Sequence, residues 1–281
     1  MMVATLTPFD SNDRLDVGAI RSHTRFLVEN GVAGLCPAGT TGEMLYLSVG
    51  EKIRLIEETC GAAGNVPVIA GVWALYEREI QLLCRAAKTA GAAAVFLPPP
   101  IYYPSSDDVV YRHYASVHEA AGLPVFAYNI PAYAANAISL DCIERLVNDG
   151  VIAGIKDSTG RADQMKALLD RFGGRIAVEA ASDSFALEAK KLGADGFISA
   201  LANIWPASLV KLWNGDESLQ SLVDEARTAV KKSGGVPALK RLLACRGFAF
   251  SASRLPHSGL SEEQGRGLDA LFASLAERGL N

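Results

Sequence analysis

The feature of this sequence that most constrains its fold is a regular alternation of short apolar segments with longer amphipathic segments. The apolar segments are four to seven residues long, rich in Val, Ile and Ala, and often lack alternation with polar residues. Such segments are typical of parallel strands that are buried on both faces of a sheet. The strand candidates are Val3–Phe9, Gly34–Pro37, Pro67–Val72, Ala93–Pro98, Pro124–Asn129, Ile152–Lys156, Ile176–Glu179 and Gly196–Ser199.

The amphipathic segments have the spacing of helices that cover such a sheet. Several begin with Ser or Asp, which can accept a hydrogen bond from the free N–H groups of the first helical turn. Several end with a glycine just before the next strand, as in Leu192-Gly193-Ala194, and glycine suits the left-handed backbone at a helix end. The helix candidates are Asp16–Asn30, Ser48–Ala63, Glu77–Ala90, Asp107–Ala121, Ser139–Asn148 and Asp163–Arg171.

Eight strand–helix units counted in this way end near Gly215, and no linker rich in Pro or Ser divides them. A doubly wound dinucleotide-binding sheet needs Gly-x-Gly-x-x-Gly after its first strand, and the segment Thr7–Asp10 has no such motif. A closed barrel needs about 250 residues, which fits this chain. The sequence therefore predicts an α/β fold, a (β/α)8 TIM barrel over residues 1–215. Residues 216–281 are expected to form a C-terminal helical extension, packed on the barrel as part of one structural unit. Its predicted helices are Glu217–Lys232, Val236–Arg246 and Ser261–Glu277.

Composition and charge exclude several classes of function. The net charge is −4 and there is no basic stripe, so we expect no nucleic-acid binding. No apolar run reaches the roughly 18 residues that cross a bilayer, and the chain opens without the pattern of a signal peptide. The five cysteines never form a Cys-x-x-Cys pair, which is typical of reduced intracellular thiols. The four histidines are dispersed, and His113 and His118 diverge on a helix. We therefore expect a cytoplasmic protein without a membrane segment or a metal site.

In such a barrel the reacting groups lie at the C-terminal ends of the strands, and Lys156 is the strongest candidate for a catalytic residue there. It ends the apolar segment that starts at Ile152, so its amine is expected against apolar walls, which favour the neutral, nucleophilic form. Such an amine can condense with a ketone to an iminium, which accepts electrons as a C–C bond breaks or forms. The alternative is a lysine whose stem packs on the barrel rim while its ammonium group reaches water.

Two further strand ends carry polar groups that suit the same chemistry. Tyr128 can relay a proton to and from a substrate, or it can be a core tyrosine with a satisfied hydroxyl group. The segment GTTGE at 39–43 has two glycines, which let the backbone approach a ligand, and the N–H and hydroxyl groups of Thr40 and Thr41 can hold a carboxylate. The alternative for this segment is an ordinary turn. It lacks the Lys-Ser/Thr ending of a phosphate-binding loop, so nucleotide binding is not indicated.

Together these segments resemble the dihydrodipicolinate synthase/N-acetylneuraminate lyase family of class I, pyruvate-handling lyases and aldolases. The resemblance covers essentially the whole chain, and it rests on the order and spacing of motifs that are individually modest. The matching motifs are Thr7-Pro8-Phe9, GTTGE at 39–43, IYYP at 101–104, YNIP at 128–131, GIKDS at 154–158, GADGFIS at 193–199 and Arg254-Leu255-Pro256 followed by Leu260-Ser261.

The resemblance implies a role for each matching position. Lys156 is then the Schiff-base lysine, and Tyr128 is the general acid and base that also orients the pyruvyl carboxylate. The loop from Gly39 to Gly42 binds that carboxylate through the backbone of Thr40 and Thr41, whose hydroxyl groups join a relay with Tyr128.

Further roles implied by the resemblance concern other loops and the assembly. A tyrosine from a neighbouring subunit completes the relay in some members; Tyr103 is the best match, with Tyr102 as the other candidate. Ile198 matches a residue whose carbonyl group faces the active site. Members are commonly homotetramers built as dimers of dimers, so the resemblance implies a homotetramer here.

Two departures from the family pattern bear on the substrate. Dihydrodipicolinate synthases usually carry an arginine shortly after the YN-x-P motif, which holds the carboxylate of aspartate semialdehyde, and Tyr133 occupies that place here. Without this cation the usual bidentate clamp on a second carboxylate is missing. Ala181 stands where the family has a glycine-containing turn, which adds a methyl group near the pocket. These departures count against dihydrodipicolinate synthase activity. The stretch Tyr133-Ala134-Ala135 and the IYYP segment resemble the 2-keto-3-deoxy-sugar-acid and 4-hydroxy-2-oxoglutarate aldolase branches.

The sequence therefore predicts a carbon–carbon lyase or aldolase that acts on pyruvate or another small 2-oxo acid, with no metal or organic cofactor. A dehydratase can use the same iminium. Two alternatives remain: a 4-hydroxy-tetrahydrodipicolinate synthase that condenses pyruvate with aspartate semialdehyde, and a barrel that binds a keto acid without turning it over.

Overall fold

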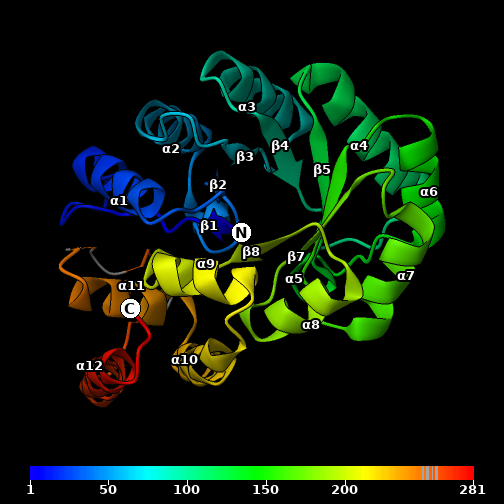
Figure 1. Cartoon of the computed structure of the whole chain (residues 1–281). Coiled ribbons are helices and arrows are strands. Elements are labelled where there is room, and N and C mark those ends of the chain that lie inside the picture. The colour runs from blue at the N-terminus through cyan, green and yellow to red at the C-terminus, as the bar shows by residue number, and fades with distance from the viewer. Residues whose placement is uncertain (249, 251–252, 255, 257–258) are drawn as a thin grey trace. The chain divides into compact units, whose positions relative to one another are not determined.

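Eight short parallel strands, each followed by one or more helices, make up the fold in the computed structural model (Figure 1). The structure describes residues 1–248, 250, 253–254, 256 and 259–281. The order of the strands in the sheet is β2-β1-β8-β7-β6-β5-β4-β3. The predicted fold class, a (β/α)8 barrel with C-terminal helices, is confirmed. The strands are β1 (Met2–Ala4), β2 (Gly34–Cys36), β3 (Ile69–Gly71), β4 (Ala94–Leu97), β5 (Val125–Asn129), β6 (Gly154–Asp157), β7 (Ala177–Ala180) and β8 (Gly196–Ser199).

Four of the helices begin at a residue whose side chain caps the first turn. Asp16 and Ser139 each accept a hydrogen bond from a backbone N–H group in the first turn, and Ser48 and Ser261 form complete capping boxes. Gly193 ends α8 with φ +100°, a conformation that suits glycine. The helices are α1 (Val17–Glu29), α2 (Val49–Ala62), α3 (Glu77–Thr89), α4 (Asp107–Ala121), α5 (Pro131–Ala134), α6 (Leu140–Asn148), α7 (Ala162–Phe172), α8 (Ala186–Leu192), α9 (Pro206–Asn214), α10 (Gln220–Lys232), α11 (Val236–Cys245) and α12 (Glu262–Glu277).

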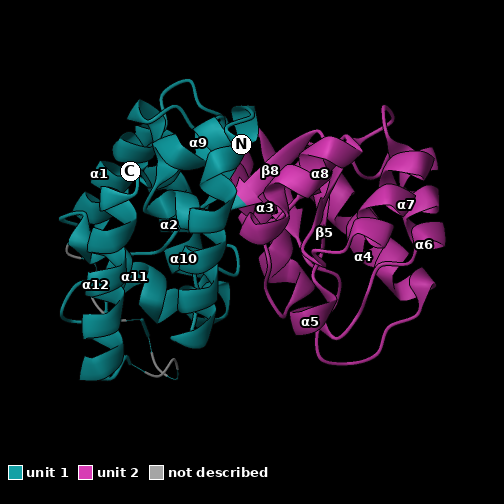
Figure 2. Cartoon of the chain, turned by 60° about the horizontal axis from the view of Figure 1, so that its bottom comes forward, with its two compact units in different colours: residues 1–68, 199–281 teal, residues 69–198 magenta. Residues whose placement is uncertain are grey.

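The chain forms two compact units, one from residues 1–68 and 199–281 and the other from residues 69–198 (Figure 2). In the second unit, β4, β5, β6 and β7 pair in register along the chain, and α3, α4, α6, α7 and α8 pack one against the next. The first unit contains β1, β2, α1 and α2 together with the C-terminal helices α10, α11 and α12, which contact one another. The expected division at residue 215 stays a prediction.

The first strand is shorter than expected, and hydrogen bonding explains why. β1 ends at Ala4, whereas the apolar pattern predicted a strand to Phe9. The N–H group of Thr5 still donates to the Cys36 carbonyl group at 3.2 Å, but that of Leu6 donates to the side-chain oxygen of Asn203 at 3.0 Å. Phe9 then forms an isolated antiparallel bridge with Leu15. An apolar pattern alone does not distinguish the segment after Ala4 from a strand.

Candidate active site

Lys156 lies in β6, and its side chain is buried with 4% exposure. Its Nζ atom is 3.9 Å from the ring centroid of Tyr128 and 5.1 Å from that of Phe96. Aromatic walls therefore enclose the amine, and the alternative of a rim lysine in water is wrong. A desolvated amine of this kind suits nucleophilic attack on a ketone.

Tyr128 belongs to β5, the neighbouring strand, where it pairs directly with Lys156. Residues paired across parallel strands point to the same face of a sheet, which explains why the amine lies over the phenol ring. The Tyr128 side chain is buried, and its hydroxyl oxygen accepts a hydrogen bond from the Ser158 hydroxyl group at 3.4 Å. Ser158 directly follows β6 and is half-buried. The arrangement gives the phenol a hydroxyl neighbour through which a proton can move.

Beside these residues a polar network fixes the ends of β5 and β6. The side-chain amide of Asn129 donates to Oδ2 of Asp157 at 2.7 Å, and the backbone N–H of Thr159 donates to Oδ1 at 3.0 Å. The backbone N–H of Ile138 donates to the Asn129 amide oxygen at 3.2 Å. Because Asp157 and Asn129 are both buried, these hydrogen bonds hold the strand ends rigidly. Lys156 and Tyr128 are thus placed by their immediate chain neighbours.

The remaining predicted residues of this unit lie at or beyond its strand ends. Tyr102, Tyr103 and Tyr133 are exposed by 78%, 74% and 75%, so their rings are open to solvent or to a partner. Ile198 is buried in β8. Ala181 directly follows β7 and is half-buried, as expected for a residue beside a pocket.

The loop predicted to hold a carboxylate, residues 39–43, belongs to the other compact unit. Its glycines are buried, and Thr40 and Thr41 are half-buried between them. A Cβ atom at Gly42 would lie 3.0 Å from the carbonyl oxygen of Thr5 and 3.2 Å from Oγ1 of Thr7, so a side chain there would crowd the first strand segment. The Thr7 hydroxyl group donates to the Gly42 carbonyl group at 2.7 Å. The loop is therefore packed closely against the segment after β1, as a rigid binding loop requires.

Several residues that shape the site were not singled out from the sequence. Asp157, Ser158 and Asn129 were part of the motifs GIKDS and YNIP, but their roles depend on contacts between strands that spacing does not show. Phe96 lies in β4, and the sequence does not show that its ring lies beside the Lys156 amine. The register between β6 and β7 is also needed to see that Glu179 pairs with Lys156.

Within the described ranges, no three His, Cys, Asp or Glu side chains gather closely enough to hold a metal ion. Within the same ranges, no helix combines the length and the apolar character needed to cross a membrane.

Comparison with known proteins agrees with the fold. The profile of the Dihydrodipicolinate synthetase family matches residues 1–274. The chain is 33% identical to a DapA-like lyase of Halobacterium salinarum, over 96% of this chain and 91% of the relative. It is 35% identical to a 4-hydroxy-tetrahydrodipicolinate synthase of Pseudomonas aeruginosa, over 92% of each chain.

A solved structure is similar over the same length. It is the chloride-inhibited dihydrodipicolinate synthase from Acinetobacter baumannii in complex with pyruvate, with 31% sequence identity and a TM-score of 0.91 over 98% of each chain. The profile and the curated relatives each span nearly the whole chain. This chain belongs to the Dihydrodipicolinate synthetase family.

Proposed function

We propose that this chain is a lyase or aldolase that handles pyruvate or another 2-oxo acid through a Schiff base on Lys156. The observation that carries the proposal is the burial of the Lys156 amine between the rings of Tyr128 and Phe96, in a member of this family. The solved relative in complex with pyruvate supports the choice of a keto acid. Burying an amine is unfavourable unless it is paired or its reactivity is used, and perturbed surroundings of this kind are frequent at functional sites.

The covalent step begins when neutral Nζ of Lys156 attacks the C2 ketone. The C2 oxygen takes one proton from Nζ and one through Tyr128 and leaves as water, and a C=N bond forms as an iminium next to the carboxylate. When the C3–C4 bond breaks, its electron pair becomes the C2–C3 double bond of an enamine, and C4 becomes an aldehyde as its hydroxyl group loses a proton. Tyr128, with Ser158 at its hydroxyl group, takes that proton and returns one to C3. Hydrolysis then releases pyruvate and restores Lys156. No metal or organic cofactor takes part in these steps.

Substrate binding in this proposal uses the loop at 39–43. The N–H and hydroxyl groups of Thr40 and Thr41 hold the carboxylate beside the C2 ketone, and Gly39 and Gly42 let the backbone approach it. The Ile198 carbonyl group faces the substrate from the end of β8. These positions follow from the family resemblance of their motifs.

The second substrate is proposed to be an aldehyde that carries no carboxylate. Tyr133 is an exposed residue of α5 and carries no positive charge, so a second carboxylate lacks the bidentate partner expected in a dihydrodipicolinate synthase. We therefore favour 2-keto-3-deoxy sugar acids whose aldehyde fragment is uncharged. The aldehyde fragment of 4-hydroxy-2-oxoglutarate keeps a carboxylate, so this substrate rests on the family resemblance alone. A dehydratase that expels the C4 hydroxyl group as water uses the same iminium.

A second candidate is 4-hydroxy-tetrahydrodipicolinate synthase activity. The Pseudomonas aeruginosa relative of that name is 35% identical to this chain, which favours it. Condensation of pyruvate with aspartate semialdehyde by the purified protein tests this candidate directly. A barrel that binds a keto acid without turnover has no use for an enclosed nucleophile, so we do not favour it.

The assembly and its location are also proposals. The exposed pair Tyr102 and Tyr103, with ring centroids 4.9 Å apart, suits a contact with a second subunit in a homotetramer. Tyr102 has φ +77°, and a bulky residue in the left-handed region often serves function. Either Tyr102 or Tyr103 is therefore proposed as the tyrosine that reaches a neighbouring active site. The scattered positions of the five cysteines, without a Cys-x-x-Cys motif, support a cytoplasmic location.

Borohydride reduction with and without pyruvate, followed by peptide mass spectrometry, tests the central proposal. A reduced pyruvyl adduct on Lys156 is the expected result. The matched control is Lys166, an exposed lysine of α7 that pairs with Asp170 and should remain unmodified. An adduct on another lysine would refute the site but keep the reaction class, and no adduct would refute the mechanism.

A further inference from the structure

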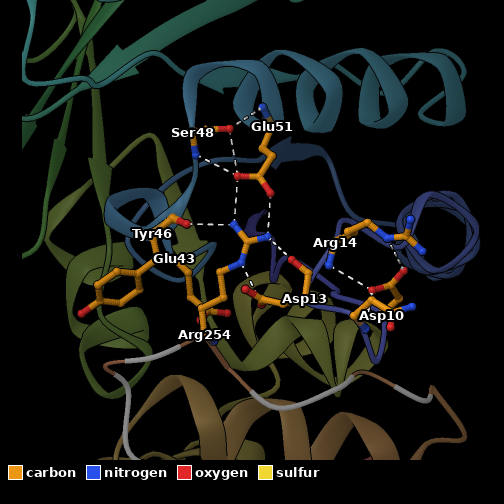
Figure 3. A network of polar contacts seen from close by, with 9 residues as sticks. Asp10, Asp13, Arg14, Glu43, Tyr46, Ser48, Glu51 and Arg254 are labelled. Carbon is orange, nitrogen blue, oxygen red and sulfur yellow. Dashed lines mark hydrogen bonds and ion pairs between the residues drawn. The ribbon is translucent and has the colours of Figure 1, made fainter.

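The guanidinium group of Arg254 donates five hydrogen bonds to residues near the N-terminal end of the chain (Figure 3). Its Nε donates to Oδ1 of Asp13 at 2.9 Å, and Nη1 donates to the Tyr46 carbonyl group and to Oε2 of Glu51, both at 2.9 Å. Nη2 donates to Oε1 of Glu51 at 2.6 Å and to the carbonyl oxygen of Asp13. A guanidinium group has five N–H donors, so each of them has an acceptor here. The side chain, 11% exposed, is therefore fixed in one orientation.

The same residue holds Glu43, which ends the loop at 39–43 (Figure 3). The backbone N–H of Arg254 donates to Oε2 of Glu43 at 3.1 Å. From α11, Nζ of Lys240 lies 2.5 Å from Oε1 of the same carboxylate, and both side chains are almost fully buried. The ring of Phe9 contacts both cations, with its centroid 4.4 Å from Lys240 Nζ and 4.2 Å from Arg254 Cζ. Both oxygens of Glu43 are thus bound by residues from the last third of the chain.

The backbone of the loop depends on this support. Ala38 and Glu43, which flank the threonines, have φ values of +57° and +58°. Residues other than glycine are unfavourable in this region and keep such a conformation where their surroundings hold them. The N–H of Glu43 donates to the Thr40 carbonyl group at 3.1 Å, and that of Met44 donates to Gly39 at 3.2 Å. These hydrogen bonds connect the backbone of Glu43 and Met44 to that of Thr40 and Gly39.

We infer that Arg254 is a positioning residue for substrate binding, which acts through Glu43 to hold the Thr40–Thr41 backbone in the conformation that binds the carboxylate of a 2-oxo acid. The inference rests on the proposed function. Five hydrogen bonds satisfy every donor of the largely buried guanidinium group and hold it in one orientation beside Glu43. The rigid fork fixes a strained loop, whose N–H groups must be pre-organised to hold an anion.

The test compares two ketones in the intact enzyme, pyruvate and its uncharged methyl ester. Arg254→Lys keeps the positive charge but replaces the planar fork with three donors on a single nitrogen, which cannot reach all five acceptors. The pyruvate concentration that half-saturates borohydride trapping on Lys156 should rise at least about tenfold. Trapping of methyl pyruvate should change less than about twofold, because the ester does not need the anion-binding loop.

Arg241→Lys is the matched control. Arg241 lies on α11 and makes a similar forked pair, but with Asp269 of α12, so its change should leave trapping of both ketones as in the wild type. If Arg254→Lys does not fold, Asp13→Asn weakens one contact at an exposed residue, and a smaller change in the same direction is expected.

Each outcome decides the inference. Unchanged pyruvate trapping in Arg254→Lys, or an equal loss for both ketones, would overturn the positioning role while the Schiff-base proposal stands. If the wild type itself forms no adduct, the proposed function falls, and the inference falls with it.

Discussion

Glu179 pairs directly with Lys156 across β7 and β6, so the two side chains leave the sheet on the same face. The Glu179 side chain is buried, and its Oε2 atom has no hydrogen-bond partner among the described residues. The next residue in the row, Gly196 of β8, makes room for it, because a Cβ atom there would lie 2.0 Å from Oε2. Burial raises the pKa of Glu179 to about 7, and the charge of Asp195 adds to this effect. A titratable carboxyl group therefore lies in the same row of side chains as the proposed nucleophile.

We predict that Glu179 makes stability depend on pH. The pKa of this carboxyl group is raised from 4.5 to about 7 in the folded chain, so between these values the folded state keeps a proton that the unfolded state has lost. The stabilisation is present in full below pH 4.5 and is lost as the pH rises through about 7. Relative to Glu179→Gln, the free energy of unfolding of the wild type should fall by about 3 kcal/mol over this range. Urea unfolding of both proteins at several pH values measures the difference, and a constant difference contradicts the prediction.

Replacing the proposed nucleophile should abolish covalent chemistry without unfolding the chain. Lys156→Met fills a similar volume between the rings of Phe96 and Tyr128 and removes the amine. Turnover of a 2-oxo acid should fall by at least about a thousandfold, because no other group forms the iminium. Steady-state kinetics and circular dichroism check the two halves of this expectation. Substantial activity in a folded Lys156→Met protein would rule out the mechanism.

Tyr128→Phe separates binding from proton transfer. The ring remains to enclose the Lys156 amine, but the hydroxyl group that Ser158 contacts is gone. We expect kcat to fall by about a hundredfold to a thousandfold, in the range of lost general acid–base catalysis, while the Lys156 adduct still forms with pyruvate. Trapping and turnover are measured on the same preparation, and an unaltered kcat would show that another group carries the proton.

Tyr133→Arg should alter the choice of aldehyde. An arginine at this exposed position of α5 offers the forked donors that a second carboxylate needs. Condensation of pyruvate with aspartate semialdehyde should rise by about tenfold or more relative to the wild type, a gain of about 1.4 kcal/mol. Tyr133→Phe, which adds no charge, is the control. Equal rates in the Arg and Phe variants would show that this residue does not select the aldehyde.

The sequence predicted the strand ends well, because their signals are local. β8 was predicted with its observed bounds and α4 with its own, and Lys156 and Tyr128 were placed on neighbouring strands. Each of these assignments needs nothing beyond an apolar run, a capping residue and a glycine. The predicted length was wrong where a distant residue ends the element. β1 is shorter than predicted because the Asn203 side chain accepts a hydrogen bond from the N–H group of Leu6.

Other parts of the site could not be predicted because they depend on distant residues. α8 and α9 were not predicted as separate helices: α8 has seven residues and follows a short 3-10 turn at Asp183–Phe185, so its period is hard to see. The role of Glu43 in GTTGE depends on Lys240 and Arg254, which lie about two hundred positions further along the chain. No spacing rule relates such residues before the fold is known.

The separation of 211 residues between Arg254 and Glu43 also sets an order on the ribosome. At about 5 to 20 residues per second, roughly ten to forty seconds pass between the synthesis of the loop and the synthesis of its clamp. The continuous segment 69–198, which carries Lys156 and Tyr128, is complete before Arg254 has been made. A nascent chain therefore holds the proposed nucleophile before the loop proposed to bind the carboxylate is secured, and the proposed activity would begin only after Arg254 has been synthesised.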